Sequence, residues 1–317
     1  MKYGVCCIVL DLENNDPPKK FKKITYSNFS KMPKEQAIKT LSERILNNID
    51  VTFEAIKYCN NNNLCYRLSS DLFPLITYDK ANVKLEELPD YGKIKDLFGQ
   101  IKTYLHNNPI RISCHPSPFN VLASKNINAV EKTIKELNFY SWFMDQIGCP
   151  ADHNSPMNLH VHNKDGSHEE IIDRFLENFN KLDPNCRARL TIENDDKLNC
   201  WSVVQLIEKF HPKTKIPICF DFLHHRCYPD GIEEKDAFLS CVETWGDIKP
   251  LFHYSESREG KNPRAHADYP SNVFNTYDCD VDVDFEFKMK DKAINHFIDS
   301  IIKKITENQT GSCVVVE

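Results

Sequence analysis

The sequence predicts a single α/β domain, a (β/α)₈ (TIM) barrel with a metal cluster at the C-terminal ends of its strands. Eight short β-type runs recur along the chain, and helix-type stretches separate most of them. Most of these runs finish on or near His, Asp or Glu. Because the C-terminal strand ends of such a barrel converge on one face, these residues are predicted to share one site. The runs are Tyr3–Leu10, Cys65–Ser69, Arg111–His115, Asn158–His162, Arg189–Asn194, Pro217–Phe222, Leu251–Glu256 and Asp282–Phe287.

The intervening stretches carry helical periodicity. In Glu35–Tyr58, apolar residues recur three or four positions apart, which indicates an amphipathic helix. Polar, irregular segments at Asp11–Lys31 and Ser257–Asn275 are expected to be long loops over the active face. We expect residues 1–308 to form the barrel domain and residues 309–317 a flexible tail. The other predicted helices are Asp90–Asn107, Ala129–Gln146, Ser167–Leu182, Cys200–Phe210 and Lys290–Ile305.

The length and composition favour an intracellular globular protein over a disulfide-stapled or membrane protein. A chain of 317 residues is long enough to bury a large core without staples, and its 13 cysteines are scattered, several of them inside apolar strand runs. We therefore expect free thiols, no membrane span and an intracellular protein, in cytoplasm or nucleus or encoded by a virus and acting there. The net charge of −6 disfavours a general polyanion binder, but bound divalent cations would offset it locally.

Eight residues at or near strand ends are candidate metal ligands. A lone histidine at a strand end is more often structural, but so many ligand-type residues at successive strand ends indicate a multi-metal site. A carboxylate that points into a barrel mouth also needs a cation. The candidates are His115, His160, Glu193, Asp221, His224, His253, His266 and Glu286.

The mixture of imidazoles and carboxylates, without a cysteine ligand, suits Mn²⁺, Zn²⁺ or Fe²⁺ better than a structural thiolate zinc site. Two or three adjacent ions are the usual device for hydrolysing a phosphodiester. Glu193 and Glu286 are the expected shared ligands, because a carboxylate offers one oxygen to each of two ions.

Several ordered motifs resemble the UV-damage endonuclease family, whose relatives include endonuclease IV and xylose isomerase. The similarity runs from the first strand to about residue 295. The motifs are His115-Pro116-Ser117-Pro118-Phe119, Arg189-Leu190-Thr191-Ile192-Glu193-Asn194-Asp195-Asp196, Asp221-x-x-His224-His225, His253-x-Ser255, Ala265-His266-Ala267 and Asp282-Val283-x-x-Glu286-x-Lys288, with Arg67 to Pro74 and Thr244-Trp245.

The resemblance implies a metal-dependent DNA repair endonuclease that cuts the phosphodiester 5′ of a damaged nucleotide and leaves a 3′-hydroxyl. It implies two or three divalent ions per chain, Mn²⁺ foremost, with Zn²⁺, Mg²⁺ and Fe²⁺ open. Damaged double-stranded DNA is the expected partner, and the protein is expected to be a monomer. The catalytic candidates are Glu193, Glu286 and Lys288, and the DNA-binding candidates are Pro118, Phe119, Asn120, Arg67 and Arg258.

This chain also departs from the family pattern. A Gly-Gln pair that precedes the lesion-probing aromatic residue is Ser117-Pro118 here, so the glutamine is lost and Phe119 remains. A lysine that is modified in some members is Leu251, and a glycine pair after the fourth strand is His162-Asn163. A Tyr and an Asn near the first strand become Val5 and Val9, which are expected to remove polar groups from the cleft.

These departures leave alternatives open. An apurinic/apyrimidinic endonuclease of the endonuclease IV type would need the same metals and a pocket that rejects a base. A sugar isomerase or epimerase on the same barrel would need a polar pocket for a small polyol and no DNA groove. A non-catalytic DNA-binding remnant is disfavoured, because unused buried carboxylates and imidazoles would be costly.

Overall fold

The computed structural model describes residues 1–117 and 119–311, and confirms the predicted barrel. Eight parallel strands form one sheet, in the order β6-β5-β4-β3-β2-β1-β8-β7. The two edges meet through a parallel bridge between Asp221 and His253, and the His253 amide donates to the Phe220 carbonyl at 2.9 Å. The strands are β1 Tyr3–Cys6, β2 Cys65–Leu68, β3 Ile112–Cys114, β4 Met157–His160, β5 Leu190–Glu193, β6 Ile218–Cys219, β7 Leu251–Tyr254 and β8 Asp282–Phe285.

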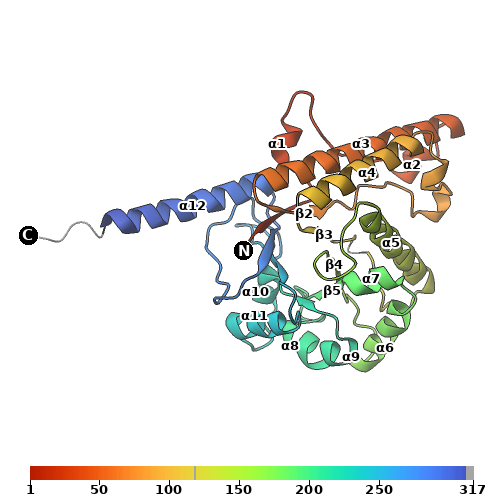
Figure 1. Ribbon diagram of the computed structural model, residues 1–317. Coiled ribbons are helices and arrows are strands. Elements are labelled where there is room, and N and C mark those ends of the chain that lie inside the picture. Colours follow the sequence, from red (N-terminus) through yellow and green to blue (C-terminus); the bar gives the residue numbers. More distant parts are fainter. Residues whose placement is uncertain (118, 312–317) are drawn as a thin grey trace, which may run out of the picture.

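The helices surround the strands, and α12 projects from the body of the barrel (Figure 1). The α-helices are α1 Leu10–Glu13, α2 Tyr26–Phe29, α3 Lys34–Asn61, α4 Tyr91–Asn107, α5 Ile127–Gln146, α6 His168–Phe179, α7 Pro184–Arg189, α8 Val203–Gln205, α9 His211–Thr214, α10 Phe222–Cys227, α11 Glu234–Glu243 and α12 Lys290–Gly311. Two 3₁₀ turns, η1 Asp79–Ala81 and η2 Leu85–Glu87, follow β2, and a π-helical stretch, η3 Leu206–Phe210, joins α8 to α9.

Local sequence signals explain where these helices lie. Helix α3 buries Leu41, Ile45 and Ile49 on one face, at the predicted spacing. Helix α6 begins at a capping box, in which the Ser167 hydroxyl accepts from the Glu170 amide at 3.2 Å and Glu170 Oε2 accepts from the Ser167 amide at 2.8 Å.

Alternation along the strands separates an apolar layer from a polar barrel interior. In β5, Leu190 and Ile192 belong to the hydrophobic core against the helices, whereas Thr191 and Glu193 point inward. Gly4 in β1 leaves room for this polar interior, because a Cβ there would lie 1.8 Å from Asp284 Oδ1. The barrel therefore has a column of polar side chains below its C-terminal face.

Some element boundaries differ from the predictions. Each predicted strand is present, but the described strands are shorter than the predicted runs. The predicted loop Asp11–Lys31 contains most of α1 and all of α2, and α7, α9, α10 and α11 were not predicted. Helix α12 reaches Gly311, past the predicted start of the tail, and residues 312–317 lie outside the described residues.

Three residues were placed wrongly. Arg189 was expected to begin the strand run Arg189–Asn194, but it ends α7 and its guanidinium lies 2.6 Å from Asp145 Oδ1 on α5. Val5 and Val9, expected in the cleft, are buried in the hydrophobic core. The helix turn and the core packing thus override the simple period-two pattern at these positions.

Candidate metal centre

The predicted ligand residues lie at the C-terminal ends of the strands. Seven of the eight join the residue groups described below, and His266 lies beside them in the loop between β7 and β8. His160 and Glu193 are the last residues of β4 and β5, and His253 lies within β7. His115, Asp221 and Glu286 follow β3, β6 and β8 at once or after one residue, and His224 lies on α10.

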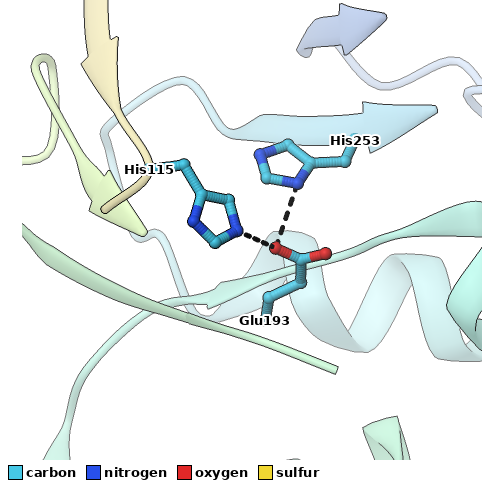
Figure 2. Close-up of side chains that lie close together, drawn as sticks. All are labelled: His115, Glu193 and His253. Carbon is cyan, nitrogen blue, oxygen red and sulfur yellow. Dashed lines mark hydrogen bonds and ion pairs between the residues drawn. The ribbon is translucent and has the colours of Figure 1, made fainter. Parts of the chain in front are cut away.

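Glu193 is the centre of this arrangement. Its carboxylate is buried, and Figure 2 shows His115 and His253 directed at the same oxygen. Oε2 lies 3.2 Å from His115 Nε2, 3.0 Å from His253 Nδ1 and 3.6 Å from His160 Nε2. Oε1 lies 3.1 Å from His224 Nδ1. Four imidazoles from four different elements thus converge on one carboxylate.

A second pair of carboxylates adjoins this group. His253 Nδ1 also lies 3.3 Å from Glu286 Oε1, and Asp221 lies within reach of both residues. Asp221 begins α10, where its Oδ1 accepts from the His224 amide at 2.7 Å. Among the described residues, Asp221 Oδ2 is buried without a hydrogen-bond partner, and His253 Nδ1 faces the two glutamate carboxylates without forming a hydrogen bond to either. Buried polar atoms left without a partner are costly, and a cation between them would satisfy both.

Among the described residues, three groups made only of these predicted ligands therefore have the geometry of metal sites. In each group the ligand atoms all lie within 4.8 Å of one another. Glu193 belongs to two of the groups and His253 to two, so the sites are contiguous. The groups are His115, Glu193 and His253; His160, Glu193 and His224; and Asp221, His253 and Glu286.

His266 occupies a more peripheral position than the other predicted ligands. Its Nδ1 lies 2.6 Å from the Glu286 carbonyl and 3.7 Å from Glu286 Oε2. The backbone around it forms an antiparallel bridge with Ser257. The long loop between β7 and β8 therefore brings His266 to the edge of the third group.

The charges in the centre depend on one another. Burial alone raises the pKa of Glu193, but the imidazoles of His253 and His160 outweigh it and hold this pKa well below its usual range. Burial lowers the pKa of His224, but the carboxylates of Asp221 and Glu193 raise it well above the usual value. Ligands must lose protons to bind a metal, so cations bound here would replace these protons as the countercharge.

Inward-facing residues one step below the ligands hold the centre in place. The Asn158 amide donates to Glu193 Oε2, and the Thr191 hydroxyl donates to Asn158 Oδ1 at 3.0 Å. Arg67 donates to Glu286 and lies 4.0 Å from Asp284 Oδ2. Asn158, Thr191 and Asp284 were not predicted as part of the site. Each stands two residues before a predicted ligand. Because residues two apart in a strand point to the same side, this spacing could have identified them.

The residues predicted to bind DNA occupy different environments. Phe119, in the connection from β3 to α5, is 87% exposed, whereas Asn120 is buried and its amide donates to Ser117 O and Glu136 Oε1, both at 3.0 Å. Arg67 is also buried, beneath the metal centre. Arg258 pairs with Asp268 Oδ2 at 3.1 Å. The prediction at Pro118 lies outside the described residues, and Lys288, a catalytic candidate, is exposed after β8.

A further group joins the predicted ligand His160 to His162 and Asp195, which were not predicted as ligands. His162 Nδ1 lies 2.8 Å from Asp195 Oδ1, and this contact, followed by one with Cys200, raises the pKa of His162 to about 9. The rings of His162 and His160 are stacked, with their centroids 4.7 Å apart.

Comparison with known proteins identifies the family. The family model described as UV-endonuclease UvdE matches residues 1–314. The chain belongs to this family. A UV DNA damage endonuclease of Bacillus anthracis (strain A0248) is 30% identical over 272 residues, which cover 85% of this chain and 82% of that protein. Another, from Bacillus cereus (strain G9842), is 29% identical and covers 95% and 94%.

Solved structures agree with this assignment. The crystal structure of SacUVDE has a TM-score of 0.79 at 27% identity and covers 96% of this chain and 99% of that one. Endonuclease IV from Thermus thermophilus covers 96% of this chain and 100% of its own, with a TM-score of 0.55 at 12% identity, which supports the shared barrel fold alone. The predicted UvdE resemblance and barrel are therefore confirmed. Among the helices of residues 1–311, none combines the length and apolar character of a membrane span.

Proposed function

We propose that this UvdE-family protein is a metal-dependent DNA repair endonuclease, which cuts the phosphodiester immediately 5′ of a damaged nucleotide and leaves a 3′-hydroxyl. The convergence of four imidazoles on the buried carboxylate of Glu193 carries the proposal, because it occurs in a chain of this family at the C-terminal barrel face. Curated relatives of similar length are UV DNA damage endonucleases.

Different groups of these residues would bind different metal ions. Glu193 would contribute to two ion sites, one with His115 and His253 and one with His160 and His224. Bound divalent ions would activate a water and neutralise the phosphate and the leaving oxygen. We infer Mn²⁺ as the first candidate, with Zn²⁺, Mg²⁺ and Fe²⁺ as outcomes of a metal analysis, since oxygen and imidazole ligands accept all four.

The third residue group extends the centre toward β8. Asp221 and Glu286 supply two more carboxylates around His253. The Arg67 guanidinium beside Glu286 fixes this carboxylate from below and offsets part of its charge. Lys288, exposed two residues beyond Glu286, is proposed to contact the substrate phosphate from the rim of the centre.

The substrate is proposed to be a damaged duplex that lies across this face, where Phe119 presents an exposed aromatic ring. Such a ring can stack where a base has been lost or displaced. Leu198, 77% exposed on the loop after β5, adds a second apolar side chain on a connection that leaves the C-terminal face. Apolar side chains of this kind open base steps in other DNA-binding proteins.

One experiment tests the proposed function directly. The metal-loaded protein is incubated with otherwise identical duplexes that carry an abasic site, a cyclobutane dimer, a 6-4 photoproduct or no lesion. We expect incision 5′ of at least one lesion, with a 3′-hydroxyl on the product, and no cutting after chelation. Failure to incise any damaged duplex with Mn²⁺, Zn²⁺, Mg²⁺ or Fe²⁺ would refute the proposal.

A further inference from the structure

His162 adopts a backbone conformation that a histidine rarely takes. It follows β4 by two residues, and its φ angle of +50° lies in the left-handed region. A side chain with a Cβ is disfavoured there, whereas glycine accepts the conformation without penalty. Strain of this kind persists where the surroundings fix it, and at active sites it is often part of the function.

The contacts of His162 show what the strained backbone achieves. Its Nδ1 lies 2.8 Å from Asp195 Oδ1, and the Nδ1 of His160 lies 3.1 Å from the same oxygen; both are ion-pair contacts, and neither has the geometry of a hydrogen bond among the described residues. The two imidazole rings are stacked, with centroids 4.7 Å apart and planes 19° from parallel. One buried carboxylate oxygen is thus shared by a predicted metal ligand and by the ring stacked upon it.

Asp195 is held rigidly for this role. Its amide donates to the Trp201 carbonyl at 2.8 Å, and its Oδ2 accepts from the Trp201 amide at 3.1 Å. Trp201 is buried in turn, and its indole nitrogen donates to Asn163 O at 3.1 Å. These bonds occupy the backbone and one oxygen of Asp195, so Oδ1 is left to face the two imidazoles.

The two nitrogens of His160 therefore face different partners. Nε2 lies 3.6 Å from Glu193 Oε2, on the side of the metal centre, and Nδ1 faces Asp195. A metal-bound imidazole commonly donates its other N–H to a carboxylate, which fixes the ring and raises its basicity as a ligand.

We propose that Asp195 and His162 form a positioning pair that fixes the His160 ring for metal binding, with His162 holding the carboxylate from its far side. This inference rests on the proposed metal-dependent function, since it takes His160 as a ligand. If residue 162 had a purely structural role, glycine would serve better, because it fits the left-handed backbone without strain. A histidine at this position is therefore explained by a use for its imidazole.

The test uses the full-length protein and three variants. His162→Gly removes the imidazole and relieves the backbone. His162→Asn tolerates the left-handed region and keeps a side-chain donor for Asp195. Lys215→Gly is the matched control, because Lys215 is also left-handed, at φ +59°, but lies exposed at the end of α9, away from the centre.

The measurements are Mn²⁺ affinity by competition with a chelator, bound ions per chain, and the thermal midpoint of the metal-free protein. For His162→Gly we expect an unchanged number of ions, a metal affinity weaker by about 10- to 100-fold and a midpoint that does not fall. His162→Asn should recover part of the affinity, and Lys215→Gly should bind metal like the unaltered protein.

Distinct results would overturn the inference. If His162→Gly binds Mn²⁺ as tightly as the unaltered protein, the pair has no positioning role. If it holds one ion fewer per chain, His162 is itself a ligand, and the positioning assignment is wrong. An unaltered protein that binds no divalent ion would instead refute the proposed function on which the inference rests.

Discussion

Replacing Phe119 by alanine should weaken the recognition of damaged DNA far more than it weakens the fold. The side chain is 87% exposed, so its loss should change the free energy of unfolding by no more than about 0.5 kcal/mol. Stacking of one base on an aromatic ring is worth roughly 1–3 kcal/mol. If Phe119 stacks at the lesion, kcat/KM on damaged duplex should therefore fall by roughly 5- to 150-fold, since 1.4 kcal/mol is about tenfold.

The assay compares kcat/KM on a damaged duplex with the dissociation constant of an intact duplex, at one salt concentration. Ile127→Ala is the matched control, because Ile127 is 73% exposed at the start of α5, in the same connection. We expect Phe119→Ala to lose recognition of damaged DNA while binding to intact DNA stays nearly constant, and Ile127→Ala to leave both unchanged. Equal losses on both duplexes, or an unfolding free energy lowered by more than about 1 kcal/mol, would show that Phe119 acts by packing.

Four further predictions concern the metal centre and specificity. Glu193→Gln should lower the incision rate by more than about a hundredfold, which exceeds the loss expected when only a residue that contacts a metal ligand is changed. Circular dichroism should show that the fold is retained, and full activity would contradict the role of Glu193. Leu251 is buried and offers no ligand atom at the position where the family resemblance implies a lysine, so a third ion should be weakly bound or absent; three tightly held ions by elemental analysis would contradict this. Chelation should lower the thermal midpoint by several degrees in a scan at fixed protein concentration, because ions at a hundred times their Kd contribute about 2.7 kcal/mol per site; an unchanged midpoint would argue against tight binding. Abasic duplex should be cut at least as fast as dimer-containing duplex, since a flexible lesion costs least to open, and a strong preference for the dimer in side-by-side rates would show that other loop residues read the photoproduct.

The barrel could be predicted from the sequence because it depends on local pattern. Strand alternation, and a ligand-type residue at or near the end of most strands, can be read directly from residues such as His160 and Glu193, and parallel strands in a barrel carry such ends to one face. The metal-binding role of these residues stays a prediction. The bridge between Asp221 and His253, which closes the barrel, confirms this expectation at the junction of the first and last strands of the sheet order.

What the sequence could not predict depends on long-range packing. Arg189 was predicted to lie in a strand, but it is the last residue of α7, and its side chain pairs with Asp145 on α5. Val5 reads as a cleft residue but packs in the hydrophobic core. The left-handed turn at His162, and the loop that holds Asp195 against it, arise only when the segments after β4 and β5 come together.

The metal centre also explains how an acidic protein can bind DNA. Several of the acids behind the net charge of −6, among them Glu193, Asp221 and Glu286, are gathered in the barrel mouth. Two divalent ions bound among them would bring the formal charge to about −2 and would place the added positive charge on the face that receives the phosphate. Without metal, these carboxylates would repel a phosphodiester. With metal bound, the same site would attract the phosphodiester and hold it beside the water to be activated. Binding of DNA and binding of metal would then be coupled through one set of carboxylates, so each should strengthen the other by the same factor.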